Sequence, residues 1–202
     1  YDQGNIQSVI NSLDKINVDY ALCKTISDLN NCTHIILPGV GSFPKVLSSL
    51  RSLNFIDALN FQVLKQGKFF LGICVGFQIL FDYGLEQKKT EGLGWINGVC
   101  EKFNIKNNKI ILPHIGWNSV HDINKNPIFK NISDETDPLF YFIHSYKISN
   151  TDDQNVNISY TFYHEKFISS INKNNIYGVQ FHPEKSQANG LLLLKNFVNL
   201  NA

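Results

Sequence analysis

The residue with the clearest potential for chemistry is Cys74, which is the centre of a Gly-Ile-Cys-Val-Gly segment at residues 72–76. An apolar run at residues 68–73 predicts a buried strand before it, and residues 75–81 predict a helix after it. A strand, a tight turn and a helix around Gly-x-Cys-x-Gly are typical of a nucleophile elbow with Cys in the Ser position. The glycines let the backbone pack closely, and the amides at the helix start favour a thiolate and can bind an oxyanion.

A buried structural cysteine at a strand end is the competing interpretation, because most buried cysteines only pack. The strand and the helix that flank Cys74 favour the catalytic interpretation. The same context is lacking for the other cysteines, which we assign to packing: Cys23, Cys32 and Cys100.

A thiolate nucleophile needs a group that accepts a proton and later returns it to the leaving amine, and histidine is the usual choice. His182 is the best candidate of the six histidines, because it ends the apolar run at residues 176–181 and is followed by Pro-Glu. Parallel strands end along one edge of a sheet, so His182 can meet Cys74 there. Glu184 can hold the imidazole in one tautomer. Considered without His182, Glu184 would be interpreted as a surface charge at the start of a helix.

A second glycine turn, Leu-Pro-Gly-Val-Gly at residues 37–41, follows another predicted strand at residues 34–37. The amide of Val40 could face the same edge of the sheet and bind an oxyanion. A plain glycine-rich turn is an equal alternative. A phosphate-binding loop is disfavoured, since neither the GxxxxGK[ST] nor the GxGxxG spacing occurs here.

Around these sites, strands alternate with helices along the chain. Helices are predicted at residues 6–13, 43–50, 55–65 and 190–200, and further strands at residues 18–22, 139–148 and 157–163. This alternation predicts an α/β fold with a mostly parallel central sheet, helices on both faces and added antiparallel strands. With no linker or repeat, residues 1–202 are expected to form one domain.

Composition excludes several classes of protein. The 202 residues are 43% hydrophobic and 17% charged, which is typical of a globular protein. The net charge of +1 gives no sign of a nucleic acid or a membrane surface as a partner, and no apolar run is long enough to cross a bilayer. Four cysteines without a CxxC pair favour the reducing cytoplasm, and we expect neither a metal nor a cofactor.

Taken together, these motifs resemble the class I glutamine amidotransferases, which have a flavodoxin-like fold. More closely, they resemble the glutaminase subunit of imidazole glycerol phosphate synthase, the HisH family. Further segments in family order carry the resemblance: Glu-Gly-Leu-Gly at 91–94, Pro-His-Ile-Gly-Trp-Asn at 113–118, His-Ser-Tyr at 144–146 and Gln-Phe-His-Pro-Glu-Lys-Ser at 180–186. The chain departs from the family pattern at Lys147, where an aromatic is common, and its first strand is expected to be missing or truncated.

The resemblance implies roles for individual residues. Cys74, His182 and Glu184 would form a catalytic triad, and the amides of Val40 and Val75 would form the oxyanion hole. The glutamine pocket would be lined by Gly39, Gly41, Gln78, Glu86, His144, Ser145 and Tyr146.

The resemblance also implies a partner. A (β/α)8-barrel cyclase would form a heterodimer with the chain through Pro113, His114, Trp117 and Asn118, and would receive ammonia for imidazole glycerol phosphate formation in histidine biosynthesis. Read without the family, Trp117 would be a core aromatic and His144 a structural histidine.

Three other functions stay open at this point. The chain could be a paralogous glutaminase that serves another amidating enzyme, for example one acting on a surface sugar. It could be a cysteine hydrolase or peptidase that acts alone. An inactive regulatory homologue is disfavoured, because all three triad residues are present.

Overall fold

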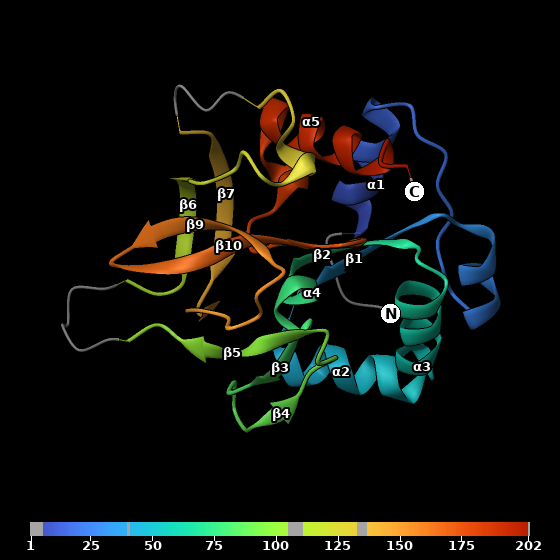
Figure 1. The fold of residues 1–202 in the computed structure, drawn as a ribbon, viewed down its shortest axis with the longest axis horizontal. Coiled ribbons are helices and arrows are strands. Elements are labelled where there is room, and N and C mark those ends of the chain that lie inside the picture. The colour runs from blue at the N-terminus through green and yellow to red at the C-terminus, as the bar shows by residue number, and fades with distance from the viewer. Residues whose placement is uncertain (1–5, 40, 105–110, 133–136, 202) are drawn as a thin grey trace.

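A mixed β-sheet forms the centre of the protein, and its parallel part positions the residues of interest (Figure 1). The computed structural model describes residues 6–39, 41–104, 111–132 and 137–201. Strands β1 (His34–Gly39), β2 (Phe69–Cys74) and β11 (Ile176–Val179) lie side by side and are parallel. Their carboxyl ends therefore meet at one edge of the sheet, as the sequence predicts.

The rest of the sheet extends from β11 in the order β11-β10-β8-β5-β3-β4, with β9 paired to β10. Within this extension β3 and β5 are parallel, and the other neighbours are antiparallel. The strands are β3 (Phe81–Gly84), β4 (Thr90–Glu91), β5 (Ile96–Lys102), β8 (Tyr146–Ile148), β9 (Asn157–Tyr163) and β10 (Glu165–Lys173). The predicted α/β class is confirmed. The sheet is mixed: β1, β2 and β11 form a parallel group of three, and β3 and β5 form a further parallel pair.

A separate two-stranded ribbon packs beside this sheet. It consists of β6 (His114–Ser119) and β7 (Leu139–His144), paired antiparallel from His114 opposite His144 to Ser119 opposite Leu139. The run predicted as one strand at residues 139–148 is therefore divided at Ser145. Its first half belongs to the ribbon and its second half, β8, belongs to the main sheet.

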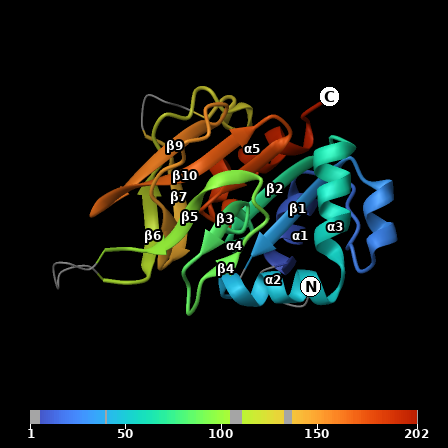
Figure 2. The same ribbon diagram turned by 60° about the horizontal axis from the view of Figure 1, so that its bottom comes forward.

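Helices cover both faces of the parallel strands. Helices α1 (Ile6–Lys15) and α5 (Gln187–Val198) lie on one face, and α2 (Phe43–Ser52) and α3 (Phe55–Leu59) lie on the other (Figures 1 and 2). A π-helical segment, η2 (Asn60–Lys65), continues α3, so one predicted helix spans both. Short 3-10 turns complete the described helices: η1 (Ile26–Asn31), η3 (Pro127–Phe129) and η4 (Pro183–Lys185).

The core explains why these elements form. Strand β11 is buried along its whole length and β2 nearly so, as expected for strands covered on both faces. Helix α2 buries Phe43 and Leu47 against one face, and α5 buries Leu193 and Phe197 against the other. Within the described residues, no helix is long and apolar enough to span a bilayer.

Two predicted elements differ from the structure. The strand predicted at residues 18–22 is wrong: this segment pairs with no described strand, and Tyr20 and Leu22 are 43% and 51% exposed. An alternating apolar pattern does not by itself make a strand, because a strand also needs a neighbouring strand to satisfy its backbone hydrogen bonds. The helix predicted at residues 75–81 is α4 (Val75–Gln78), which is shorter because the chain turns at Leu80 to begin β3.

Candidate active site

Cys74 lies at the junction of β2 and α4 in a strained backbone conformation. Its φ is +56° and its ψ is −111°, a region that residues with side chains rarely occupy. Such strain persists only where the surrounding structure enforces it, and it is typical of a nucleophile elbow. Its side chain is 4% exposed. The backbone geometry agrees with the elbow that the sequence predicts.

Three glycines enforce this geometry by letting backbone segments touch. A Cβ added to Gly76 would lie 2.0 Å from the Leu37 carbonyl oxygen, and one added to Gly39 would lie 2.2 Å from the Gly76 nitrogen. A Cβ on Gly72 would lie 2.3 Å from the Gly76 oxygen. No side chain fits at these positions, because the obstructing atoms belong to the backbone. The end of β1 and the elbow are therefore packed directly against each other.

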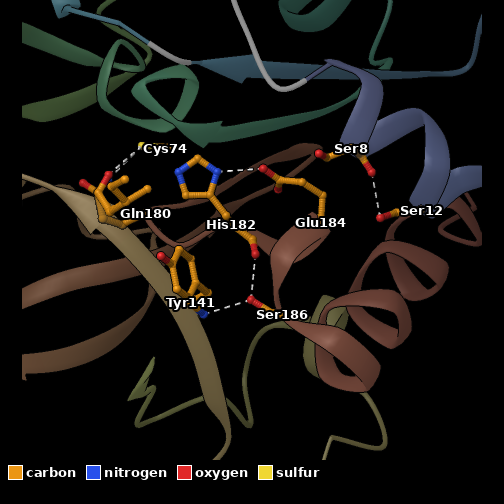
Figure 3. Close-up of polar contacts among 9 residues, drawn as sticks. Ser8, Ser12, Cys74, Tyr141, Gln180, His182, Glu184 and Ser186 are labelled. Atoms are coloured by element: carbon orange, nitrogen blue, oxygen red, sulfur yellow. Dashed lines mark hydrogen bonds and ion pairs between the residues drawn. The ribbon is translucent and has the colours of Figure 1, made fainter. Parts of the chain in front are cut away.

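His182 lies next to Cys74 (Figure 3). It reaches the cysteine because β11 and β2 are parallel neighbours, with Val179 opposite Ile73. The Nδ1 atom of His182 lies 2.7 Å from Glu184 Oε1, and the two side chains are 4% and 1% exposed. Since the carboxylate accepts this hydrogen bond, Nδ1 carries the proton and Nε2 faces the sulfur.

The electrostatic environment favours a protonated His182. Burial alone lowers the pKa of His182, but the negative charges of Cys74 and Glu184 outweigh it and raise this pKa to about 10. An imidazolium next to Cys74 stabilises a thiolate and can donate a proton to a leaving amine.

A serine that the sequence did not single out holds the His182 loop against the ribbon. The Ser186 hydroxyl donates to the His182 carbonyl at 2.6 Å and accepts from the Tyr141 amide at 2.9 Å (Figure 3). The His182 amide donates to the Tyr141 carbonyl at 2.8 Å. Strand β7 thus fixes the backbone that carries the base. The only signal for Ser186 in the sequence was its place at the end of the His-Pro-Glu-Lys-Ser segment.

The residues predicted to line a glutamine pocket fall into two groups. The first borders the elbow: Gly39 ends β1, Gly41 is exposed beyond it, and the carboxylate of Glu86 accepts from the Phe43 amide at 2.7 Å at the start of α2. Val40, predicted to supply an oxyanion amide, lies outside the described residues. Val75 is the first residue of α4, next to the sulfur.

The second group connects α4 with the start of strand β8 and with Ser145, which directly precedes β8. The Nε2 atom of Gln78 donates to the Tyr146 carbonyl at 3.1 Å. Burial, followed by the negative charges of Glu86 and Cys100, raises the pKa of the half-buried Tyr146. Ser145 connects β7 to β8 and is half-buried, and its carbonyl accepts a hydrogen bond from the Phe103 amide.

The side chain of His144 is not free to bind a substrate. It is 6% exposed, its Nδ1 donates to the Tyr146 carbonyl at 2.8 Å, and its Nε2 lies 3.1 Å from His114 Nδ1. Both ring nitrogens are used within the protein. This arrangement agrees with the interpretation of His144 as a structural histidine.

The residues predicted to face a partner are divided between the two sides of β6. Pro113 and Trp117 are exposed, and Asn118 is half-buried. His114 is 3% exposed and stacks on Tyr163 at 4.0 Å, so its side chain points into the protein. The prediction that His114 faces a partner is therefore wrong for its side chain. Side chains alternate between the two faces of a strand, so the side chain of His114 points to the face opposite that of Ile115.

Acid should destabilise the folded protein through these two histidines. Burial first, together with neighbouring histidines, lowers the pKa of His144 to about 3 and of His114 to about 4, against an ordinary value of 6.5. The unfolded chain therefore takes up protons that the folded protein does not, and stability present above pH 6.5 is lost as the pH falls towards 4. His182 adds almost no slope well below pH 6.5, because there the histidine is protonated in the unfolded chain as well as in the folded protein. Near and above pH 6.5 it contributes a slope of the opposite sign, because only the unfolded chain loses the proton there.

The expected slope for His144 is about 1.4 kcal/mol of unfolding free energy per pH unit. Urea unfolding at several pH values between 4 and 7 measures it. The His144→Gln variant should show a shallower slope. Equal slopes in the native protein and His144→Gln would contradict the assignment.

Within the described part of the chain, no group of three or more His, Cys, Asp or Glu residues could hold a metal ion. The groups at the site that can take part in chemistry are Cys74, His182 and Glu184 and the backbone amides near them. These groups suit acyl transfer, in which a thiolate attacks a carbonyl carbon and a histidine protonates the leaving group.

Known proteins share this architecture. Among solved structures, a protein described as a glutamine amidotransferase superposes with a TM-score of 0.74 at 14% identity, covering 97% of this chain and 93% of the other. The glutaminase domain of Trypanosoma brucei CTPS superposes with a TM-score of 0.63 at 13% identity, covering 98% of this chain and 88% of that chain. At these identities the likeness shows the fold.

Sequence comparison is more specific. The family model for class I glutamine amidotransferases matches residues 1–200. The imidazole glycerol phosphate synthase subunit HisH of Pelagibacter ubique is 41% identical, covering 99% of this chain and 97% of the relative. The subunit of the same name from Leptospira interrogans is 42% identical over the same shares. The chain is therefore a class I glutamine amidotransferase and belongs, within that family, with the HisH subunits.

Proposed function

We propose that this chain hydrolyses glutamine at Cys74 and delivers the ammonia to a cyclase subunit, which uses it to form imidazole glycerol phosphate in histidine biosynthesis. The observation that carries the proposal is the buried Cys74, His182 and Glu184 arrangement on a nucleophile elbow. Its relatives over nearly their full length are named as subunits of that synthase, which supports the choice of reaction and partner.

The proposed chemistry is acyl transfer in two steps. The thiolate of Cys74 attacks the side-chain amide carbon of glutamine, and the resulting oxyanion is held by backbone amides, that of Val75 and, by resemblance, that of Val40. His182 donates a proton to the departing ammonia, leaving a thioester. Water then attacks the thioester with His182 as the base and releases glutamate, while Glu184 keeps the imidazole oriented.

The outer face of the β6–β7 ribbon suits a protein partner. In its ladder Ile115 lies opposite Ile143, and Trp117 lies opposite Tyr141. Ile115, Trp117 and Ile143 are 55%, 45% and 37% exposed, and an exposed apolar group of this kind is typical of an interface.

The same ribbon borders the reaction site. The Ile143 carbonyl lies 3.8 Å from the Cys74 sulfur. A subunit docked on this face would receive ammonia close to where it is released. This matters because ammonia in bulk water near neutral pH is mostly protonated and is then no nucleophile.

The test measures glutamate release from glutamine by the chain alone and with the cyclase subunit carrying its ribonucleotide substrate. We expect weak release alone and an increase of about tenfold or more with the loaded cyclase, since segments that complete a catalytic site often close only when substrate is bound. Trp117→Glu should greatly reduce the stimulation, because it places a charge in the apolar face.

The matched control is Phe61→Glu, which puts the same charge on another exposed aromatic residue, in η2, and should be stimulated like the native chain. Cysteine-dependent hydrolysis that the cyclase does not change would support the glutaminase activity. It would contradict the cyclase as the partner and favour a different amidating enzyme.

A further inference from the structure

A buried glutamine contacts the nucleophile from the side opposite His182. Gln180 is fully buried just beyond the end of β11, and its Nε2 lies 3.7 Å from the Cys74 sulfur (Figure 3). Its backbone amide donates to the Ser169 carbonyl of β10 at 2.8 Å, which fixes the residue in the sheet. The distance is ordinary for a hydrogen bond to sulfur, whose atomic radius is larger than that of oxygen.

The orientation of this amide follows from its neighbours. The side-chain atom of Gln78 next to the Tyr146 carbonyl must be the nitrogen, because a carbonyl oxygen only accepts. The same nitrogen lies 3.0 Å from the side chain of Gln180, which must therefore present its oxygen there. The remaining end of the Gln180 amide, its N–H, then faces the sulfur.

The chain of hydrogen bonds continues beyond Tyr146, and each donor and acceptor in it can be assigned. His144 donates through Nδ1 to the same Tyr146 carbonyl, so its Nε2 accepts from His114 Nδ1. His114 Nε2 in turn accepts from the Asn118 side chain at 3.2 Å. Each amide and each ring has one orientation that satisfies its partners, so Gln180 cannot turn its oxygen to the sulfur without breaking bonds of buried groups.

The chemical consequence concerns the thiolate. A buried thiolate that has lost its water needs hydrogen-bond donors, and an N–H aimed at the sulfur stabilises the charged form relative to the thiol. Together, Gln180 and the imidazolium of His182 would hold the sulfur in one position. Since Gln180 does not exchange protons with the substrate, its effect is on the ionisation and placement of the nucleophile.

We propose that Gln180 is a positioning residue for the nucleophile: its side-chain N–H holds the Cys74 sulfur as a thiolate, and Gln78 sets its orientation. The inference rests on the proposed function only in taking Cys74 as the nucleophile. A purely structural role for Gln180, in which it serves only to satisfy Gln78, would leave the ionisation of Cys74 unchanged.

The experiment follows alkylation of Cys74 by iodoacetamide as a function of pH, with the modified peptide identified by mass spectrometry because the exposed Cys23 can react as well. Gln180→Leu removes the donor, and Gln180→Glu replaces it with a carboxylate of the same shape. The midpoint of the alkylation rate should move to higher pH by about one unit in Gln180→Leu and further in Gln180→Glu, where like charges repel. In glutamine hydrolysis kcat should fall about tenfold or more with a smaller change in KM.

Gln62→Leu is the matched control, since it removes another buried glutamine whose Nε2 donates to Asn30 at 2.8 Å. It should leave the alkylation midpoint unchanged. Gln78→Leu removes the hydrogen bond that orients Gln180 and should move the midpoint in the same direction by a smaller amount. This variant tests the proposal if the Gln180 variants do not fold.

An unchanged midpoint in folded Gln180 or Gln78 variants would overturn the inference, and so would an equal shift in Gln62→Leu. The proposed function fails in a different way, namely if a Cys74→Ala protein still hydrolyses glutamine. The two failures are thus distinguished by separate measurements.

Discussion

Replacing Cys74 by alanine should reduce glutamine hydrolysis to the level of the blank, a fall in kcat of about 10⁴-fold or more. The sulfur is the atom that forms the bond to substrate carbon in the proposed reaction, and no neighbouring group can substitute for it. Alanine is smaller and fits the same backbone position, so the protein should stay folded. Glutamate release coupled to glutamate dehydrogenase measures the effect, with circular dichroism to verify the fold.

Cys23→Ala is the matched control, because it removes an exposed cysteine far along the chain and should retain full activity. Adding Glu184→Gln or His182→Asn to Cys74→Ala should cause little further loss, since residues that act as one unit have non-additive effects. Cysteine-independent hydrolysis at the native rate would refute the assignment of the nucleophile.

Replacing Gly76 by alanine should destabilise the protein by about 4 kcal/mol or more, or prevent folding altogether. The new Cβ would lie 2.0 Å from the Leu37 carbonyl oxygen, and this oxygen belongs to a parallel strand that cannot move without breaking its pairing with β2. Opening this contact would also separate the end of β1 from the elbow. Urea unfolding measures the loss, and glutamine hydrolysis should be lost with it.

Gly67→Ala is the matched control for this change. Gly67 has a φ of +71° and nothing within 4 Å of an added Cβ, so alanine there suffers only the backbone strain, about 1 kcal/mol. If Gly76→Ala proved as stable as Gly67→Ala, the close packing of β1 against the elbow would be wrong.

Local spacing in the sequence was sufficient to predict the central features of the candidate site. Gly-x-Cys-x-Gly between an apolar run and a helix predicted the elbow, and the structure has the positive φ and close glycine contacts that an elbow requires. His182 followed by Pro-Glu predicted a carboxylate beside the imidazole, and the structure places Glu184 there. These features depend on residues a few positions apart, so a short stretch of chain contains the information.

Features that depend on distant segments were decided by the tertiary structure. The apolar alternation at residues 18–22 forms no strand, and the run at residues 139–148 is divided between two sheets. The alternation of side chains along β6 does not determine which of its faces is buried, and in the packed structure the side chain of His114 lies on the buried face.

The contact of Gln180 with Cys74 joins residues 106 positions apart and depends on the orientation of Gln78, which is set by a carbonyl on another strand. The sequence by itself thus determined which residues can do the chemistry, because that follows from residue type and short spacing. Only the tertiary structure decided which groups surround them, because strand neighbours and side-chain faces are chosen by the energy of the whole packed core.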